Sequence, residues 1–504
     1  EEAKKKADEK QKKTGKIEVE KVKPLELDIE NCRDRIVRLT ANSSHMGDAV
    51  LSKDGDKLYY QAAFEDDYDL WQHDLKDGST KLVMKGVGQG NLQTDKDVKN
   101  LFICNGSSIK KVDLSGFSTK NISFEANFNY KPAEERQYLF DHIWRQVKDK
   151  FYDPKIHGVD WEGYRKTYEK FLPYINNNFD FQEMLSEMLG ELNASHTGAR
   201  YYASNSALTT ANLGVFFDPQ YQGDGLKIQE IIKRGPFDVK NTGVTAGCII
   251  ESIDGEEIKA GMDYFPLLDG KVGKNVRLGI RNAKGKKMEV TVKAISQGKL
   301  NNLLYKRWVD RNRAFVDSIS GGRIAYVHVK AMNSESFRTV YSELLSDKNR
   351  NRDAVIVDER HNGGGWLHDD LCTLLNGKQY QEFVPHGKVV GRDPFNKWVK
   401  PSCVMICEND YSNGHGFPWV YKELGIGKLI GAPVAGTMTA VWWETLMDNT
   451  LVFGIPQVGC RDMRGVFGEN TQLNPDIEVY NSPEDFINGH DTQLERAVKE
   501  MMKK

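Results

Sequence analysis

The sequence predicts a multidomain protein that combines α+β and α/β parts, and three observations support this fold class. Its 504 residues are enough for about three or four domains. Alternating apolar and polar residues in the first quarter indicate antiparallel strands, and a helical period takes over after Pro132. From residue 322 onward, continuous apolar runs alternate with helical segments, which is typical of an α/β domain with a largely parallel sheet.

The composition narrows the classes of partner. A hydrophobic content of 39% and a charged content of 28% are those of an ordinary globular protein. A net charge of -2 gives no reason to expect nucleic acid or an anionic membrane as a partner. No apolar stretch approaches the ~20 residues that a membrane span needs. The chain starts at Glu1 without a signal-like segment, so we expect a processed or truncated product.

The cysteine pattern argues against a metal centre or a disulfide framework. The seven cysteines are odd in number and scattered: Cys32, Cys104, Cys248, Cys372, Cys403, Cys407 and Cys460. No CxxC pair and no HExxH motif is present, so we expect buried free thiols and neither metal nor cofactor.

Residues 1–130 are predicted to be β-rich behind an N-terminal arm. Residues 1–16 are Lys- and Glu-rich with almost no apolar stripe, which indicates a frayed helix or a disordered arm. Short alternating runs broken by Asp-Gly turns follow at 51–60, 69–83, 92–104 and 108–114, with a period near 40. Two such units resemble β-propeller blades, which need stacking neighbours. The region is therefore a propeller remnant or a small β-domain packed on the rest.

Residues 131–205 are predicted to form a helical domain, and residues 206–298 a PDZ-like domain. Leu139, Ile143 and Val147 recur at intervals of four and define the buried face of the first helix. Two further helices are expected before residue 193. The stretch AGCIIESIDGEEI and the β-hairpin after it resemble a PDZ domain, which binds an extended peptide at a sheet edge. A small β-rich insert is the alternative.

Two strand ends in the α/β domain, residues 299–504, carry the candidate chemistry, because sites of open α/β sheets lie at the carboxyl ends of strands. HNGGG at 361–365 follows a buried strand, and its glycine N–H groups suit an oxyanion, although a flexible turn would look the same. Ser412 follows the apolar run VMIC and precedes a helix-like run from Phe417. A serine there is a turn residue or a nucleophile.

A nucleophilic serine needs a base, and the residues alone leave several candidates open. An α/β-hydrolase elbow would read GxSxG, but position 410 is Asp, although His415 and His490 follow the serine. A Ser-Lys pair would want a lysine about 25 residues downstream, where Thr437 stands instead. The remaining candidate is His196 at the end of the third predicted helix, which could equally be a core histidine.

Five motifs in order resemble the tricorn protease family, which is related to the C-terminal processing serine peptidases. They are ASH at 194–196, the PDZ-like stretch, VDERHNGGG at 357–365, SNGHGFP at 412–418 and ENTQLNPDIEV at 469–479. The resemblance covers about residues 15–490. It implies a catalytic domain with a crotonase-like or ClpP-like core. It also implies a serine endopeptidase or oligopeptidase that hydrolyses peptides or unfolded proteins and that assembles as a homo-oligomer.

The resemblance also implies roles for individual residues. The nucleophile is Ser412, the general base His196, and Ser195 and Glu469 orient the histidine, so that the four form a Ser-His-Ser-Glu tetrad. The oxyanion hole uses the backbone N–H of Asn413 and that of Gly365, with Gly364 as second choice. Two departures stand out: the family has Asp where this chain has Asn413, and Gly-Gly where it has Gly436-Thr437.

A second function class remains open beside the peptidase. Relatives with the same fold bind retinoids and lack chemistry, so the alternative is a non-catalytic protein that binds peptides or apolar ligands. The presence of all four tetrad residues favours the peptidase. Neither function involves nucleic acid or a membrane, and the resemblance leaves the compartment open between the cytoplasm and the periplasm of a bacterium or archaeon.

Overall fold

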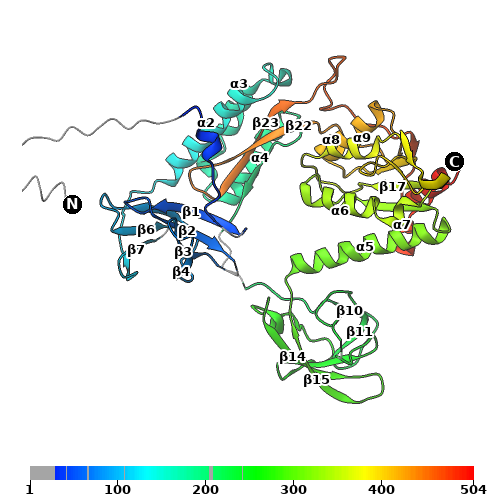
Figure 1. Cartoon of the computed structure of the whole chain (residues 1–504), viewed down its shortest axis with the longest axis horizontal. Helices are drawn as coiled ribbons and strands as arrows, with labels where there is room; N and C mark the ends of the chain where they lie inside the picture. Colours follow the sequence, from blue (N-terminus) through cyan, green and yellow to red (C-terminus); the bar gives the residue numbers. More distant parts are fainter. Residues whose placement is uncertain are drawn as a thin grey trace, which may run out of the picture. The chain divides into compact units, whose positions relative to one another are not determined.

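The computed structural model describes residues 29–40, 43–64, 67–106, 108–203, 208–240 and 242–503. The chain divides into two compact units, one up to Tyr130 and one from Lys131 onward (Figure 1). The predicted N-terminal arm, residues 1–16, lies outside the described residues. None of the helices in the described ranges is both long and apolar enough to span a membrane.

The first unit consists of two four-stranded antiparallel sheets with strands in sequence order. The strands are β1 (His45–Leu51), β2 (Lys57–Ala63), β3 (Asp69–Asp74), β4 (Thr80–Met84), β5 (Asn91–Thr94), β6 (Asn100–Cys104), β7 (Ile109–Asp113) and β8 (Thr119–Ile122), after the short 3₁₀ helix η1 (Cys32–Arg35). The two sheets share a core that includes Tyr59, Leu70 and Leu101. They are also joined by polar bonds, since the Asp48 carboxylate accepts from the Leu92 N–H at 2.8 Å.

Three helices open the second unit and pack on a small sheet. The helices are α2 (Pro132–Lys150), α3 (Trp161–Glu169) and α4 (Asn178–Gly190), with η2 (Ile156–Gly158) and η3 (Leu172–Tyr174); the sheet has the order β22 (Thr439–Thr445), β23 (Leu451–Gly459), β9 (Ala199–Tyr201). Leu139 and Ile143 of α2 share one buried cluster with Phe453 and Ile455 of β23. The orange strands lie beside the cyan helices in Figure 1. Two segments about 300 residues apart therefore form one core, which brings the C-terminal part of the chain to the end of α4.

The PDZ-like segment is a twisted antiparallel sheet with the order β10-β11-β12-β14-β15, and β13 pairs with β12. Its strands are β10 (Val215–Phe217), β11 (Leu226–Ile231), β12 (Ile249–Ile253), β13 (Glu256–Glu257), β14 (Asn275–Arg281) and β15 (Lys287–Lys293), with η4 (Phe265–Leu268). The predicted Asp254-Gly255 turn joins β12 to β13, and both residues have a positive φ. Arg307 of the next helix, α5 (Gln297–Ile319), holds Glu230 of β11 with two bonds of 2.6 Å.

The remaining residues form the predicted α/β domain, whose sheet is entirely parallel. Its order is β16 (Ile324–His328), β17 (Ala354–Asp358), β20 (Ser402–Ile406), β21 (Lys428–Gly431), β24 (Ile477–Glu478). The other elements are α6 (Ser334–Leu344), α7 (Asp347–Arg350), α8 (His368–Leu375), α9 (Asn413–Glu423), α10 (Pro483–Asn488), α11 (Thr492–Met501), the hairpin β18 (Gln381–Phe383) and β19 (Gly391–Asp393), and η5 (Pro385–Gly387).

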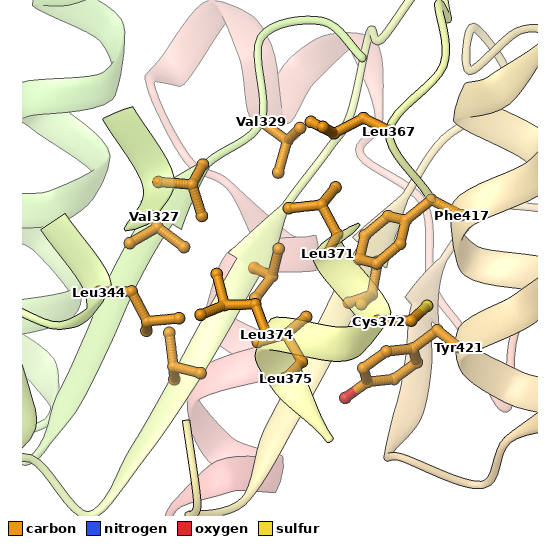
Figure 2. Close-up of a cluster of buried hydrophobic side chains, with 14 of the residues drawn as sticks. Val327, Val329, Leu344, Leu367, Leu371, Cys372, Leu374, Leu375, Phe417 and Tyr421 are labelled. Atoms are coloured by element: carbon orange, nitrogen blue, oxygen red, sulfur yellow. The ribbon is translucent and has the colours of Figure 1, made fainter. Parts of the chain in front are cut away.

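Alternate residues of these strands point into two separate cores. Val355 and Val357 face a cluster with α6, α8 and α9, which Figure 2 shows. Ile356 faces the other side, where the core is completed by residues of α5 and α11 such as Val316 and Leu494. Because both faces are covered, the strands read as continuous apolar runs, which explains why the sequence predicted a parallel sheet.

The cysteines carry free thiols throughout, and Cys372 and Cys403 lie in these two cores. Cys248, Cys372, Cys403 and Cys407 are buried. The expectation of burial is wrong for the other three, since Cys32 is exposed and Cys104 and Cys460 are partly exposed.

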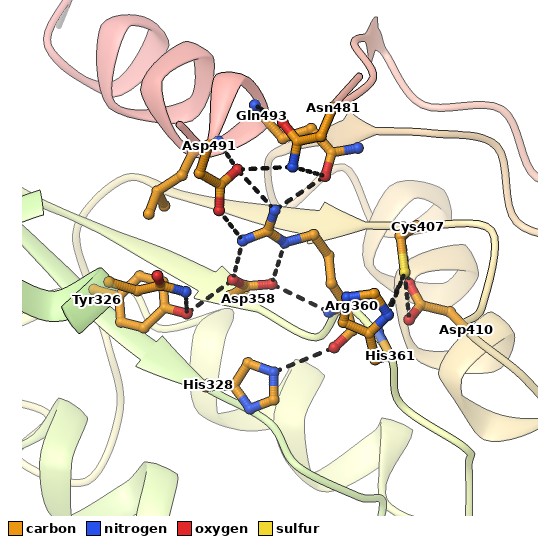
Figure 3. Close-up of polar contacts among 12 residues, drawn as sticks. Tyr326, His328, Asp358, Arg360, His361, Cys407, Asp410, Asn481, Asp491 and Gln493 are labelled. Carbon is orange, nitrogen blue, oxygen red and sulfur yellow. Dashed lines mark hydrogen bonds and ion pairs between the residues drawn. The ribbon is translucent and has the colours of Figure 1, made fainter. Parts of the chain in front are cut away.

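A buried ionic network connects the end of β17 to α11 (Figure 3). The Arg360 guanidinium binds both carboxylate oxygens of Asp358, at 2.9 and 2.8 Å, and both oxygens of Asp491, each at 2.9 Å. Tyr326 of β16 donates to Asp358 at 2.8 Å. Asp358 and Arg360 are almost completely buried, so water cannot stabilise their charges, and each depends on the opposite charge of the other.

We predict that Arg360→Met lowers the free energy of unfolding by ~3–5 kcal/mol, because Asp358 would be left buried without its counter-charge. The measurement is equilibrium denaturation in urea. The double variant Asp358→Asn, Arg360→Met removes both charges and should recover most of that loss. A loss below ~1 kcal/mol in the single variant would contradict the role given to the pair.

Candidate active site

Ser412 occupies a sharp turn between β20 and α9. Its backbone angles are φ 58° and ψ -120°, a region that side-chain-bearing residues rarely adopt, and such strain costs roughly 1–3 kcal/mol. The helix starts directly afterwards at Asn413, four residues earlier than the helix-like run from Phe417 suggested. Gly414 allows this, because a Cβ there would lie 2.7 Å from the carbonyl oxygen of Asn362. A strained strand-to-helix turn is also how α/β-hydrolases expose a nucleophilic serine.

The glycine loop after β17 lies against this turn. Strands β17 and β20 are parallel neighbours, so both of the predicted strand ends meet at one edge of the sheet. Gly364, with φ 95°, approaches so closely that a Cβ there would lie 2.6 Å from Cβ of Ser412. The loop is held in place: Met332 donates its N–H to the Gly364 carbonyl at 3.0 Å, and Trp366 donates to the Met332 carbonyl at 2.7 Å.

The backbone N–H groups next to Ser412 differ in whether they already donate to an acceptor within the protein. That of Gly364 donates to Oδ1 of Asn362 at 2.8 Å. Within the described ranges, the N–H groups of Gly365 and Asn413 donate to no protein acceptor. Both groups are therefore available to a ligand, whereas the Gly364 N–H is not.

The side chain of Asn413 holds the glycine loop from the other side. Its Oδ1 accepts from the N–H groups of Leu367 at 2.8 Å and His368 at 3.1 Å, at the start of α8. Its Nδ2 lies 2.8 Å from Nδ1 of His368. Asn413 is buried. Asn413, which stands where the family has Asp, therefore uses its side chain to hold the start of α8.

His196 lies at the end of the helical segment with its ring aligned by a polar chain. Its Nδ1 lies 2.7 Å from Oγ of Ser195, and Ser195 Oγ donates to Oε2 of Glu469 at 2.9 Å. Ser195 also donates its backbone N–H to Glu469. The Ser195 hydroxyl donates its proton to the Glu469 carboxylate, so it can only accept a hydrogen bond from His196. The proton of the neutral imidazole is therefore on Nδ1, and Nε2 is left as an acceptor.

Two residues that the sequence did not single out complete this arrangement. Oγ1 of Thr439 lies 3.0 Å from Nδ1 of His196 and 2.9 Å from Oγ of Ser195. The hydroxyl of Tyr411 accepts from the backbone N–H of His196 at 2.6 Å, and the two rings lie 4.8 Å apart. Tyr411 stands beside Ser412 in the sequence, a signal that could have been used. Thr439 begins the run TAVWWET and is typical of an ordinary strand residue.

The competing base candidates have other contacts. Nδ1 of His415 accepts from the backbone N–H of Thr437 at 3.1 Å, and burial lowers the His415 pKa to about 4. Oγ1 of Thr437 accepts from the backbone N–H of Ser412 at 3.0 Å, so the residue in the place of a lysine base holds the serine turn. His490 is exposed after α10. Of these candidate bases, only His196 lines the cavity next to Ser412.

This cavity has a volume of about 680 Å³. Besides Ser412, His196, Gly365 and Asn413, it is lined by one face of α9 with Gly416, Trp419 and Val420, and by Met438, Val441 and Trp443. Arg200 also lines it and stacks 4.0 Å from the Trp443 ring. Oγ of Ser412 makes no hydrogen bond to His196 among the described residues, and such bonds are often long in enzymes without substrate. The lining is mostly apolar and carries both Ser412 and His196.

Burial sets the protonation of the two titrating groups of the polar chain. It lowers the pKa of His196 to about 4, so the imidazole is neutral at physiological pH. Burial also raises the pKa of Glu469, against the hydrogen bonds from Ser195, which lower it. A neutral imidazole with a free Nε2 is the state that a general base needs.

Models of three protein families match successive parts of the chain. Residues 323–479 match the model of peptidase family S41, residues 218–297 the tricorn protease PDZ domain, and residues 132–190 the tricorn protease C1 domain. The chain also shares its fold with the crystal structure of the tricorn protease, at a TM-score of 0.75 and 20% identity, over 89% of this chain and 46% of that chain. The chain is accordingly a homologue of the tricorn proteases.

Curated proteins agree with this placement. The putative tricorn-like protease C-terminal subunit of Sulfurisphaera tokodaii is 29% identical over 74% of this chain and 44% of its own length. The tricorn protease homolog of Saccharolobus solfataricus is 26% identical over 86% and 41%, and tricorn protease homolog 1 of Streptomyces coelicolor 25% identical over 94% and 47%. The chain thus spans less than half the length of these relatives.

Glu359, directly after β17, carries a buried carboxyl group. Neither of its carboxyl oxygens has a hydrogen-bond partner among the described residues, and its side chain is fully buried. Burial, together with the nearby Asp410 and Asp358, raises the Glu359 pKa well above its usual range. The folded protein therefore keeps Glu359 protonated at a pH at which the unfolded chain has released that proton.

We predict that Glu359→Gln stabilises the protein increasingly as pH rises. The raised folded-state pKa makes unfolding of the unaltered protein release a proton above pH ~4.3, so its stability falls by up to ~1.4 kcal/mol per pH unit from this group alone. Glutamine mimics the neutral acid and removes that slope. The measurement is urea denaturation at pH 5 to 8, comparing the two proteins. A constant difference across that range would contradict the prediction.

Proposed function

We propose that this protein is a serine endopeptidase or oligopeptidase of the tricorn type, which hydrolyses peptides through an acyl-enzyme on Ser412. The observation that carries the proposal is the strained turn of Ser412, placed between two free backbone N–H groups in a cavity that His196 also lines. Each feature alone also occurs in proteins without catalytic activity. Together they supply a nucleophile, a base and an oxyanion site.

In the proposed reaction, Nε2 of His196 takes the proton of Ser412 Oγ as the serine attacks the peptide carbonyl. Ser195 and Glu469 keep the proton on Nδ1 and stabilise the imidazolium that forms. The N–H groups of Gly365 and Asn413 bind the oxyanion, and the competing choice Gly364 is disfavoured because its N–H is already used. His196 then protonates the leaving amine, and water releases the acyl group by the same steps.

The cavity supports a class of substrate. Its walls carry Trp419, Val420 and Met438, and none of the described residues that line it is acidic, so an apolar side chain next to the cleaved bond is the best fit. We propose peptides and unfolded proteins as substrates, because an extended chain can place a side chain in this cavity with its backbone at Ser412. Assembly as a homo-oligomer is part of the same proposal, by analogy with the tricorn relatives.

Finer features of the architecture belong to this proposal. We propose residues 1–130 as a partial β-propeller with an N-terminal arm, and residues 131–205 as the helical domain that carries Ser195 and His196. Residues 206–298 would be the PDZ domain, and residues 299–504 a catalytic domain with a crotonase-like or ClpP-like core. The two four-stranded meanders of the first unit and the parallel five-stranded sheet support these assignments.

A second candidate is a non-catalytic protein that binds peptides or apolar ligands in the same cavity. One observation favours it: within the described residues, Oγ of Ser412 makes no hydrogen bond to His196. An apolar slot would also hold an apolar ligand without chemistry. Reactivity of Ser412 separates the two functions.

We predict that a fluorophosphonate labels Ser412 in the folded protein, because a base and an oxyanion site activate it. Ser412→Ala should abolish labelling and peptide hydrolysis, and His196→Ala should abolish hydrolysis, with little loss of thermal stability; Glu469→Gln should reduce activity less, since it orients rather than transfers a proton. Ser342→Ala, on the exposed face of α6, is the control and should behave as the unaltered protein. Absence of an adduct on Ser412, read by mass spectrometry, would favour the binding protein.

The pH dependence of kcat/KM should have its acid limb near pH 4 rather than near ~6.5, the ordinary range of histidine. Burial lowers the pKa of His196 to about 4, so the free enzyme keeps its base neutral down to that pH. The assay uses a peptide substrate from pH 3.5 to 8, with tryptophan fluorescence to show that the protein stays folded. A limb between pH 6 and 7 would mean that His196 is solvated or is not the base.

A further inference from the structure

The two proposed oxyanion donors, Gly365 and Asn413, stand on different loops. Regular strand pairing between these loops stops before it reaches them: the last paired residues are Asp358 of β17 and Met405 of β20, and one further bond joins the Glu359 N–H to the Met405 carbonyl at 3.1 Å. Beyond that point other groups must set the distance between the loops.

Asp410 bridges this gap with one carboxyl group. Its Oδ2 accepts from the backbone N–H of Cys407 at 2.8 Å, within the serine loop, and its Oδ1 accepts from the backbone N–H of Asn362 at 3.1 Å, within the glycine loop. The side chain is buried, so water does not compete for these bonds. Figure 3 shows Asp410 beside Cys407, whose thiol also faces the carboxylate.

Asn362 extends the bridge to both donors. Its carbonyl oxygen accepts from the backbone N–H of Tyr411 at 2.9 Å, directly before the serine. Its Oδ1 accepts from the Gly364 N–H at 2.8 Å, directly before the Gly365 donor, and its Nδ2 donates to the Val329 carbonyl at 2.8 Å after β16. Asn362 is fully buried. Three loops therefore meet at one asparagine, which Asp410 locks to the serine loop.

We propose that Asp410 is a positioning residue which, through Asn362, keeps the N–H groups of Gly365 and Asn413 at the separation that a single oxyanion requires. The inference rests on the proposed peptidase function. Two donors stabilise one oxyanion only if both lie within about 2.7–3.1 Å of it, so a small change in loop spacing removes one of them from the transition state. Substrate binding in the ground state does not need that spacing.

The test compares Asp410→Ala and Asp410→Asn with the unaltered full chain. Alanine removes both acceptors, whereas asparagine keeps the shape and one acceptor oxygen. Asp448→Ala is the matched control, because Oδ1 of Asp448 likewise accepts two backbone N–H groups, from Thr450 and Leu451, in the turn between β22 and β23. Thermal unfolding shows which variants are folded at the assay temperature.

Two readouts separate positioning from a general structural role. The first is kcat and KM for a peptide that the unaltered protein cleaves. The second is the inhibition constant of a peptide aldehyde, which forms an oxyanion on the serine, against that of the matching peptide alcohol, which does not. We expect Asp410→Ala to lower kcat roughly 100-fold with KM within about twofold, and to weaken the aldehyde but not the alcohol. The kcat and the aldehyde affinity of Asp410→Asn should lie between those of Asp410→Ala and the unaltered protein. Asp448→Ala should change neither quantity.

The outcomes are distinguishable. Unchanged kcat and aldehyde affinity in both Asp410 variants would overturn the positioning role and leave the peptidase proposal standing. Equal weakening of aldehyde and alcohol would also overturn it, since it would mean that the whole cavity is distorted. If Asp410→Ala does not fold, the same comparison in Asp410→Asn decides. An unaltered protein that neither cleaves peptides nor reacts with a fluorophosphonate would overturn the proposed function and this inference with it.

Discussion

The site depends on the parallel pairing of β17 and β20. Parallel neighbours end at the same edge of a sheet, so the glycine loop and the serine turn meet although about 50 residues separate them in the chain. The approach is closer than side chains allow, which is why Gly364 and Gly414 stand where they do. Without this pairing, the free N–H groups of Gly365 and Asn413 would belong to two unrelated loops.

The base reaches the same edge by a longer route. His196 ends the helical segment, and that segment is held by a core shared with β23, which follows Ser412 in the chain by about 40 residues. Glu469 and Thr439, from the same C-terminal stretch, then orient the ring through Ser195. The α/β domain thus supplies the nucleophile and also the groups that hold its base.

Local pattern predicted most of this fold, and the reason is physical. Strands buried on both faces must be apolar throughout, and an amphipathic helix such as α2 must show its period, so both leave a signal in the sequence. The site was predicted only through the resemblance of five ordered motifs. Ser412 and His196 taken singly read as a turn and a core histidine. Thr439 gave no signal and Tyr411 only its place beside Ser412, because their roles exist only once distant segments pack. The early start of α9 depends on the strained backbone of Ser412.

The edge of the sheet that carries the site also buries three carboxyl groups, Asp358, Glu359 and Asp410. Asp358 pairs with the Arg360 guanidinium, whereas burial raises the pKa of Glu359 well above its usual range and that of Asp410 to about 8. Apolar side chains in their place would offer no acceptor for the N–H groups of Cys407 and Asn362 at the point where strand pairing stops. Loops that leave a sheet lose their backbone partners, and a buried carboxylate is a short side chain that can satisfy two of them at once. The cost in stability is therefore tied to the geometry of the site.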